Sequence, residues 1–431
     1  MKTGTQESRR APLAASEHPG ATRDPGTAPR FEVATVVVGV SLAVLVGLDG
    51  SPVAQLGRVV GVAAATVLLV RALARHAARW RGRLAVLVGA PSVAIAVGFA
   101  PHLVKGGPLP VRAAAGLLLV AGLALLICGV AAATRGRGRW RRAGAALVVA
   151  VATAVVAVVV SPAIAATNVP RPQVGDDPSS VGLAHHDVTL RTDDGVPLAA
   201  WYVDSSNRAA VVLLHGAGST RSDVLDHAAV LAGAGFGVLM IDARGHGASG
   251  GRAMDFGWHG DADVTAATGY LAGRPDVTDG RIGVVGMSMG GEEAIGASAG
   301  NERISAVVAE GATARTAVDE AWLSDEYGVR GAVQEQLERL QDRTTDLLTS
   351  ASVPTSLRAA VGASPDARYL LIAAGTEPDE EHAAKHVAAG APDRVETWTV
   401  PAAAHTGGLA TAPEEWTDRV VGFLDRVLLP R

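Results

Sequence analysis

The chain has 431 residues, 48% of them hydrophobic, and a formal net charge of −4. This charge is unevenly divided, because residues 1–170 carry 18 Lys and Arg against 5 Asp and Glu, whereas the remainder carries 20 against 37. The acidic second part would repel phosphates, which argues against nucleic acid as a partner. The single cysteine, Cys128, excludes an internal disulfide, a thiolate metal site and a cysteine nucleophile in the second part.

The first part of the chain reads as a membrane region. Residues 1–30 are rich in Pro, Ser, Thr and charge, which predicts a disordered tail. Apolar stretches follow at 31–48, 52–74, 84–104, 110–133 and 143–166. A hydrocarbon core about 30 Å thick needs about 20 apolar residues of helix, so residues 31–166 are expected to form about five transmembrane helices in a lipid bilayer. Arg58 interrupts the second stretch, and a single span or a re-entrant pair within 31–74 is the alternative.

The distribution of basic residues predicts how these helices are oriented. The connections at 75–83 and 135–142 are rich in arginine, whereas those at 49–52 and 105–112 are poor in basic residues. Connections rich in Lys and Arg stay in the cytoplasm. The pattern therefore predicts a multi-pass cell-membrane protein with a cytoplasmic N-terminus and an extracytoplasmic second part.

The last apolar stretch has a competing interpretation. Residues 134–166 have a basic start, an apolar middle and a cleavage-like Ala-Ile-Ala at 163–165, as an internal signal peptide would. The apolar run is longer than that of a signal peptide, which favours an uncleaved anchor. Residues 167–182 read as a linker. No charged residue lies in the middle of a span with an evident partner, so transport is not supported.

From residue 183 onward, short apolar runs alternate with helical patterns. The expected strands are His186–Arg191, Leu198–Val203, Ala209–Leu214, Val238–Ile241, Ile282–Val285, Ile304–Ala309, Tyr369–Ala373 and Val395–Val400. The expected helices lie near 221–233, 261–273, 289–299, 380–389 and 414–428. Because most of the strands are continuously apolar, residues 183–431 are predicted to form an α/β domain with a mostly parallel sheet and helices on both faces.

One segment of this domain, residues 312–366, does not follow the alternation. Within it, residues 331–348 place Val333, Leu337 and Leu340 at helical spacing. This spacing predicts a helical cap over the functional site. A surface helix with no functional role is the alternative.

Three segments match the pattern Gly-x-Ser-x-Gly, centred on Ser249, Ser288 and Ser298. The pattern marks a nucleophile only where a strand runs directly into a helix, so that the turn lifts the hydroxyl above the sheet. Ser288 alone has that context, between Gly286 and Gly290, which leave room for a strained turn. We therefore predict Ser288 as a nucleophile.

A serine hydroxyl needs a base to remove its proton, and His405 is the best candidate. It lies in the loop between the last expected strand and the last expected helix, at the carboxyl edge of the sheet. The other histidines considered lie at the first strand, in glycine-rich loops or on a surface-type helix.

The base in turn needs a carboxylate to orient it. Four acidic residues crowd the turn after the seventh strand, at 377–381. Their position relative to the strand favours Asp379 or Glu380, with Glu377 third and Glu381 also possible. The sequence does not choose among them.

An oxyanion hole requires two backbone N–H groups. One is expected from Met289, directly after the nucleophile, and the other from Gly216 or Ala217, in the loop after the third strand. His215 in that loop reads as an organising residue. The segment 242–247, which follows the fourth strand, reads as a loop held by charge-assisted hydrogen bonds.

Together, the segments HGAGS, DARGHGASG and GMSMGG, the acidic turn and the late AHTGG resemble the α/β-hydrolase superfamily, over residues 183–431. They look closest to its serine aminopeptidase-like and dienelactone-hydrolase-like esterases and peptidases. The resemblance implies an eight-stranded sheet, acyl-enzyme chemistry, and no metal or organic cofactor. The chain departs from the pattern by having GTEPDEE where a single Asp is usual. Dienelactone hydrolases proper use cysteine, so their substrate is not implied.

These observations favour a membrane-anchored serine hydrolase that cleaves an ester, amide or thioester in a small-molecule or acyl substrate. An acyltransferase with the same residues is one alternative, and competing nucleophiles would distinguish it. A non-enzymatic membrane protein with a relict hydrolase domain is another, and a folded domain inert to serine-reactive probes would favour it.

Overall fold

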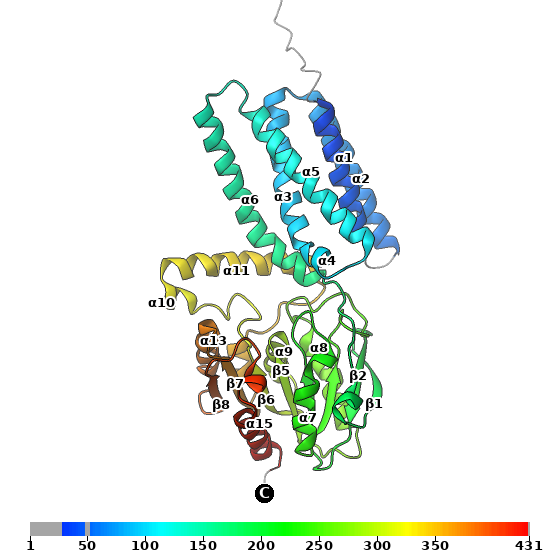
Figure 1. The fold of residues 1–431 in the computed structure, drawn as a ribbon, viewed down its shortest axis with the longest axis vertical. Helices are drawn as coiled ribbons and strands as arrows, with labels where there is room; N and C mark the ends of the chain where they lie inside the picture. The colour runs from blue at the N-terminus through cyan, green and yellow to red at the C-terminus, as the bar shows by residue number, and fades with distance from the viewer. Residues whose placement is uncertain (1–27, 48–51, 430–431) are drawn as a thin grey trace, which may run out of the picture.

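The computed structural model describes residues 28–47 and 52–429 (Figure 1). The expected tail at residues 1–30 lies almost wholly outside the described residues, as does most of the first connection at 49–52. Long helices form one part of the molecule, and a domain built on a sheet forms the other. The chain passes from the first part to the second through the last long helix.

The helical part comprises α1 (Ala28–Val46), α2 (Pro52–Arg75), α3 (Ala78–Gly98), α4 (Ala100–Val104), α5 (Leu109–Ala133) and α6 (Arg139–Thr167). Among the described helices, α2, α3, α5 and α6 are long and apolar enough to cross a membrane. About five such helices were expected, and α1 is a fifth long helix beside them. The expected stretch at 84–104 is divided between α3 and α4, because Pro101 lies in the first turn of α4, where a missing N–H is tolerated.

Helices α3 and α5 approach each other closely through glycine. A Cβ atom on Gly82 would lie 2.5 Å from the Gly129 carbonyl oxygen, and one on Gly89 would lie 2.8 Å from the Gly122 carbonyl oxygen. Such small-residue contacts are typical of helix pairs in membranes.

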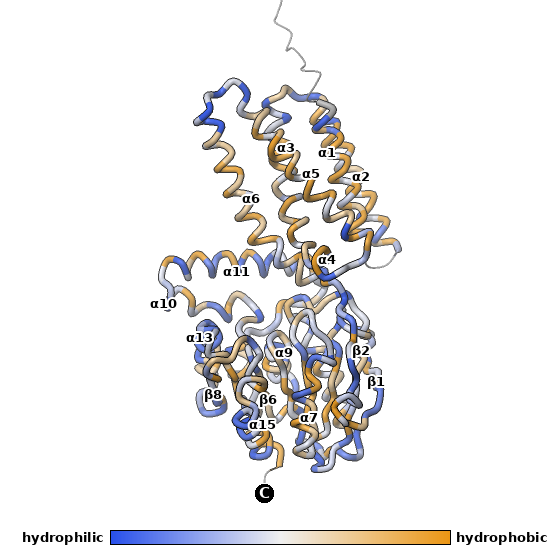
Figure 2. Tube along the Cα trace, viewed as in Figure 1, coloured by the Kyte–Doolittle hydropathy of each residue, from blue (hydrophilic) through white to orange (hydrophobic). Residues whose placement is uncertain are grey.

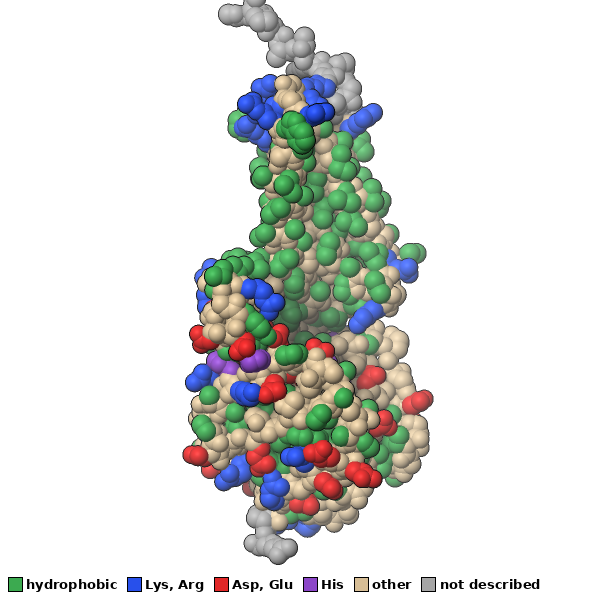
Figure 3. Space-filling model, turned by 60° about the vertical axis from the view of Figure 1, so that its left-hand side comes forward, with side chains coloured by type: hydrophobic (Ala, Val, Ile, Leu, Met, Phe, Trp, Pro, Cys, Tyr) green, Lys and Arg blue, Asp and Glu red, His purple; other side chains and the backbone are tan. Residues whose placement is uncertain are grey.

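The outer faces of the long helices are hydrophobic (Figure 2), with Leu68 and Leu147 among their exposed side chains. Arginine side chains gather at the end of the helices that is remote from the sheet (Figure 3). The two ends of the helical part therefore differ in charge, as the sequence indicated.

The sheet has eight strands, as expected. They are β1 (His186–Arg191), β2 (Pro197–Val203), β3 (Ala210–Leu214), β4 (Gly237–Ile241), β5 (Ile282–Met287), β6 (Ile304–Glu310), β7 (Arg368–Ala374) and β8 (Val395–Val400). Their order is β1-β2-β4-β3-β5-β6-β7-β8, with β2 antiparallel to both neighbours and the other pairs parallel. The carboxyl ends of β3–β8 consequently meet along one edge of the sheet.

Helices cover both faces of the sheet, which confirms the predicted α/β class. On one face, α7 (Leu225–Gly233) and α15 (Pro413–Leu428) pack into the core. On the other lie α8 (Gly260–Ala272), α9 (Met289–Ser298), α12 (Leu357–Ala363) and α13 (Pro378–Ala388). Helix α12 comes from the segment expected to form the cap, but its residues Leu357, Ala360 and Val361 are buried in this core. That helix is therefore part of the body of the domain.

The rest of the expected cap segment leaves the body between β6 and β7. It forms α10 (Leu323–Tyr327) and α11 (Val329–Leu348), and α11 lies across the direction of the long helices beside the lower part of α6 (Figure 1). The Gln341 side-chain amide of α11 donates to the Val158 carbonyl of α6 over 3.1 Å. Trp322, just before α10, stacks on His382 of α13. We call α10, α11 and the residues just before them the cap. The cap thus contacts both the body and the last long helix.

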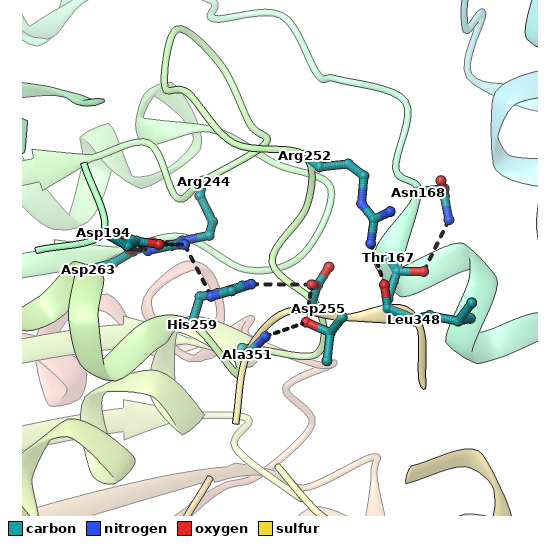
Figure 4. Close-up of polar contacts among 12 residues, drawn as sticks. Thr167, Asn168, Asp194, Arg244, Arg252, Asp255, His259, Asp263, Leu348 and Ala351 are labelled. Atoms are coloured by element: carbon teal, nitrogen blue, oxygen red, sulfur yellow. Dashed lines mark hydrogen bonds and ion pairs between the residues drawn. The ribbon is translucent and has the colours of Figure 1, made fainter. Parts of the chain in front are cut away.

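The linker after α6 is attached to the sheet domain by Arg171. Its guanidinium donates to the backbone carbonyls of four residues in the loop after β4: His246, Gly247, Ser249 and Gly251. In the same loop, Arg252 donates to the Leu348 carbonyl at the end of α11 over 2.8 Å (Figure 4). One loop therefore joins the linker, the body and the cap.

His227 of α7 predicts a pH-dependent stability. Its ring packs edge-on against Trp416, and neither ring nitrogen has a hydrogen-bond partner among the described residues. Burial lowers the pKa of His227 from 6.5 to about 4. Since the unfolded chain binds this proton more readily, stability falls as the pH drops from 6.5 towards 4.

We expect His227→Phe to keep the ring contact and remove this loss, which corresponds to about 2 kcal/mol at pH 5. Thermal unfolding of the detergent-solubilised protein at pH 8 and pH 5 measures the effect. A variant whose midpoint falls between these pH values as much as that of the parent protein would contradict the prediction.

Candidate active site

Ser288 occupies the turn between β5 and α9. Its backbone has a φ of 54° and a ψ of −124°, a strained conformation for a residue with a side chain. A Cβ atom on Gly286 would lie 2.2 Å from the Gly290 carbonyl oxygen, and one on Gly290 would lie 2.6 Å from the His215 carbonyl oxygen. Both positions therefore require glycine. The turn presents the Ser288 side chain at the carboxyl edge of the sheet.

The other two Gly-x-Ser-x-Gly serines hold structure together. The buried Ser249 hydroxyl donates to the Asp242 carbonyl over 2.6 Å and accepts from the Ala199 N–H over 2.8 Å. The Ser298 hydroxyl, inside α9, donates to the Ile295 carbonyl over 2.6 Å. The strand-to-helix context thus separates Ser288 from both.

The structure brings Ser288 and His405 together. His405 Nε2 lies 2.8 Å from Ser288 Oγ, and His405 Nδ1 lies 2.6 Å from Glu380 Oε1. A carboxylate only accepts hydrogen bonds, so Nδ1 carries a proton and Nε2 is free to accept the proton of the serine hydroxyl. Glu380 is 4% exposed, and its second oxygen accepts from the Ala374 N–H over 2.8 Å. The hydrogen bond that His405 Nδ1–H donates to Glu380 raises the pKa of His405, and partial burial opposes this shift.

The remaining acidic residues of the turn point elsewhere. Asp379 is exposed and accepts from the Tyr327 hydroxyl of the cap over 2.5 Å. Glu381 pairs with Lys385 over 2.5 Å, and Glu377 is exposed just before α13. Successive helical residues point about 100° apart, so Asp379 and Glu380, at the start of α13, face different surroundings. Of the four carboxylates that the sequence left open, with Asp379 and Glu380 favoured, the structure places Glu380 against His405.

The expected oxyanion-hole residues lie next to the nucleophile. Met289 is the first residue of α9, so its N–H has no acceptor within the helix. A Cβ atom on Gly216 would lie 3.1 Å from Ser288 Cβ, so this part of the loop after β3 adjoins the nucleophile, while Ala217 follows on the exposed side. The oxyanion role of these N–H groups stays a prediction.

Two buried histidines hold the loops around this site. His215 Nε2 accepts from the Ala243 N–H over 3.0 Å, and its Nδ1 donates to the Gly216 carbonyl over 2.7 Å. His246 Nε2 accepts from the Gly218 N–H over 3.0 Å. Burial lowers the pKa of His246 to about 4, so the ring stays neutral and able to accept. Both histidines link the loop after β3 to the loop after β4.

A chain of ionic contacts runs from the body to the end of α11 (Figure 4). Arg244 pairs with Asp263 over 2.5 Å and with Asp194 over 2.8 Å, and it donates to His259 over 3.1 Å. His259 in turn contacts Asp255 over 3.3 Å, and Asp255 accepts from the Thr349 hydroxyl over 2.5 Å. These contacts fix the loop after β4 and, through residue 349, the carboxyl end of α11.

Glu310, at the end of β6, is a positioning residue that the sequence analysis missed. Its carbonyl accepts from the Ser288 N–H over 2.7 Å. Its buried carboxylate accepts from the Gly408 N–H over 2.7 Å and from Trp416 Nε1 over 2.9 Å. Burial raises the pKa of Glu310. A charged residue at the end of the apolar run Ile304–Ala309 is the signal that could have identified it.

No group of three or more His, Cys, Asp or Glu side chains that could hold a metal ion occurs in residues 28–47 and 52–429. Three buried carboxylates near the site, those of Glu292, Glu310 and Glu380, accept hydrogen bonds from protein groups. Glu292 Oε1, one turn into α9, accepts from the N–H groups of Thr313 and Ala314 over 3.1 Å each.

Comparison with known proteins supports the fold assignment. Residues 205–353 match the family described as "Serine aminopeptidase, S33". Over 130 residues the chain is 37% identical to the "Uncharacterized protein Rv2307c" of Mycobacterium tuberculosis, which covers 29% of this chain and 46% of that protein. Over 124 residues it is 33% identical to the "Alpha/beta hydrolase domain-containing protein WAV2" of Arabidopsis thaliana, covering 28% and 39%. The chain thus spans about half the length, or less, of these relatives.

Among solved structures, an esterase of Pyrococcus furiosus, Pf2001, is 26% identical, with a TM-score of 0.48, and the match covers 61% of this chain and 98% of that one. A dienelactone hydrolase from Anabaena variabilis is 20% identical, with a TM-score of 0.41 and coverages of 57% and 98%. The family match and the order of the eight strands identify the domain that follows the linker as an α/β-hydrolase domain.

The sterics of the nucleophile turn yield a prediction. We expect Gly286→Ala to lower the yield of folded protein and its thermal midpoint strongly, because the new Cβ would meet backbone at 2.2 Å. Gly269→Ala is the control, since Gly269 is exposed on α8 and nothing lies within 4 Å of its added Cβ. Size-exclusion chromatography and thermal unfolding in detergent measure both. Equal midpoints for the two variants would show that the turn is not so constrained.

Proposed function

We propose, from the premise that the second part of the chain is an α/β-hydrolase domain, that the protein is a membrane-anchored serine hydrolase. It would cleave an ester, amide or thioester through an acyl-enzyme intermediate. The observation that carries this proposal is the hydrogen-bonded series from Ser288 Oγ through the His405 imidazole to buried Glu380. These three side chains come from separate segments, which follow β5, β7 and β8, and their order along the chain is serine, acid, histidine.

Each group has a defined task in this chemistry. His405 Nε2 takes the hydroxyl proton as Ser288 Oγ attacks the substrate carbonyl. The resulting oxyanion is stabilised by the N–H of Met289 and by that of Gly216 or Ala217. The protonated imidazole then donates to the leaving group, and a water molecule repeats the sequence to release the acid. Glu380 accepts the hydrogen bond from the Nδ1–H and so holds the imidazole in the required tautomer and orientation.

Two observations favour hydrolysis over the alternative functions. The His405 side chain is 48% exposed, so water reaches the base directly, which supports water over a bound alcohol or amine as the acyl acceptor. The three hydrogen-bonded side chains and both elbow glycines are all present, which a relict domain would not need to keep.

The anchoring and orientation are part of the same proposal. Four described helices have the length and composition to span a bilayer. The arginine-rich end of the helical part lies away from the sheet domain (Figure 3), and such ends stay in the cytoplasm. The hydrolase domain would therefore act outside the cytoplasm, at the surface of the cell membrane.

Labelling with a fluorophosphonate probe tests the nucleophile. We expect the intact protein to label and Ser288→Ala to lose labelling, together with at least about a 10³-fold fall in kcat on a reactive ester. Ser180→Ala, at an exposed serine in the short helix Pro178–Val181 near the end of the linker, is the control and should label normally. Equal labelling of folded Ser288→Ala and parent protein would refute the assignment.

The pH dependence of kcat/KM tests the assignment of Glu380 as the carboxylate that orients His405. Because Glu380 raises the pKa of His405 above 6.5, kcat/KM on a soluble ester should rise as the pH passes upward through that pKa. We expect Glu380→Gln to move this limb to lower pH and to reduce the plateau by about 10²–10⁴-fold. Asp379→Asn should leave the limb in place. If Asp379→Asn shifted the rising part of the pH profile and Glu380→Gln did not, Asp379 and not Glu380 would be the carboxylate that acts on His405.

A further inference from the structure

Helix α11 carries an exposed hydrophobic stripe. Val329, Val333, Leu340 and Leu347 are 83%, 55%, 42% and 85% exposed, respectively. At 100° per residue, these four side chains fall within a sector of roughly 40° on the helix surface. We call this set of four residues the α11 stripe.

The opposite face of α11 is acidic and faces the chain segment that precedes it, residues 317–324. Glu335 accepts from the Ser324 N–H over 2.8 Å, and Asp342 accepts from the Ala317 N–H over 2.7 Å. Burial raises the pKa of both Glu338 and Asp342. The polarity is thus the reverse of an ordinary surface helix, which buries its apolar side and exposes its charges.

The α11 stripe lies beside the hydrophobic surface of α6. Gln341, on the flank of α11, contacts the Val158 carbonyl, and the Val158 and Val155 side chains of α6 are 48% and 49% exposed. In Figure 3 the hydrophobic side chains of this projection lie on its side toward the long helices. The stripe therefore continues a surface that the proposed function places in a bilayer.

Basic side chains border the stripe. Arg330 lies on one edge and Arg343 on the other, and both are exposed. Long basic side chains at the border of an apolar stripe reach lipid headgroups while the helix lies in the interface. This arrangement is typical of a helix that lies flat on a membrane.

We infer that α11 lies in the surface of the same bilayer that holds α6, with the α11 stripe among the acyl chains. This inference rests on the proposed membrane anchoring. The binding partner of the α11 stripe is then lipid. The substrate class is long-chain acyl esters in the membrane leaflet that α11 contacts. A hydrogen bond connects the cap to the candidate active site. The Tyr327 hydroxyl, just before α11, donates to Asp379, the residue preceding Glu380.

A fluorescence experiment on the full-length chain tests the position of α11. With Cys128→Ala as background, Val333→Cys is labelled with an environment-sensitive dye and reconstituted in nanodiscs that contain lipids brominated on their acyl chains. We expect blue-shifted emission that the bromines quench. Glu302→Cys, exposed near the amino edge of the sheet, is the control and should show water-like emission without quenching. Water-like, unquenched emission at position 333, or a blue shift that depends on protein concentration, as a second copy would cause, overturns the inference.

An activity ratio tests the substrate class. We expect Val333→Glu with Leu340→Glu to lower the ratio of long-chain ester hydrolysis in vesicles to short-chain soluble ester hydrolysis by at least about tenfold. The control adds two Glu residues at the same spacing on α8, as Thr265→Glu with Ala272→Glu, both at exposed positions, and should keep the ratio. An unchanged ratio in the α11 variant overturns the substrate class. If the parent protein failed to react with the fluorophosphonate probe at Ser288, the proposed function would be rejected. The dye at position 333 would still report where α11 lies.

Discussion

Glu310 holds the loops that carry Ser288 and His405 together. Its backbone carbonyl receives the Ser288 N–H, and its carboxylate receives the Gly408 N–H, three residues after His405. Strained backbone at a nucleophile persists only where its surroundings hold it, and here one residue holds both sides of the Ser288–His405 contact. The carboxylate is buried and accepts from Trp416 as well, so α15 is fastened to the same point. A buried carboxyl group is costly unless it is hydrogen-bonded, so the contacts with Gly408 and Trp416 stabilise Glu310 in this position.

The first turn of α13 couples the cap to the acid. Asp379 bonds the cap through Tyr327, and Glu380 bonds the base. Movement of α10 relative to the body would therefore act on Asp379, the residue directly before Glu380, which contacts His405. On the other side of the site, Arg171 holds the linker against the loop after β4, and that loop supports Gly218 through His246. The carboxyl edge of the sheet is therefore where linker, cap and chemistry meet.

The sequence predicted the sheet well because its strands are continuous apolar runs such as AVVLL and IGVVGM, and burial on both faces leaves few other interpretations. It singled out Ser288 by context, and the structure places His405 beside it. It did not choose between Asp379 and Glu380, because that choice depends on where α13 begins and on the rotation of its first turn. Glu310 was missed because its partner Gly408 is 98 residues away, a distance that local pattern does not reach.

Hydrophobic spacing shows that a helix has an apolar side but not what that side contacts. The spacing of Val333, Leu337 and Leu340 predicted the helix, and a soluble domain would have turned that side inward. The structure turns the acidic side inward, where backbone N–H groups satisfy Glu335 and Asp342. Leaving the stripe in water would forgo about 1.5–3 kcal/mol for each large side chain. Contact with acyl chains beside α6 would supply that free energy without any change in the fold. The α11 stripe and the outer face of α6 therefore form one membrane-contacting surface.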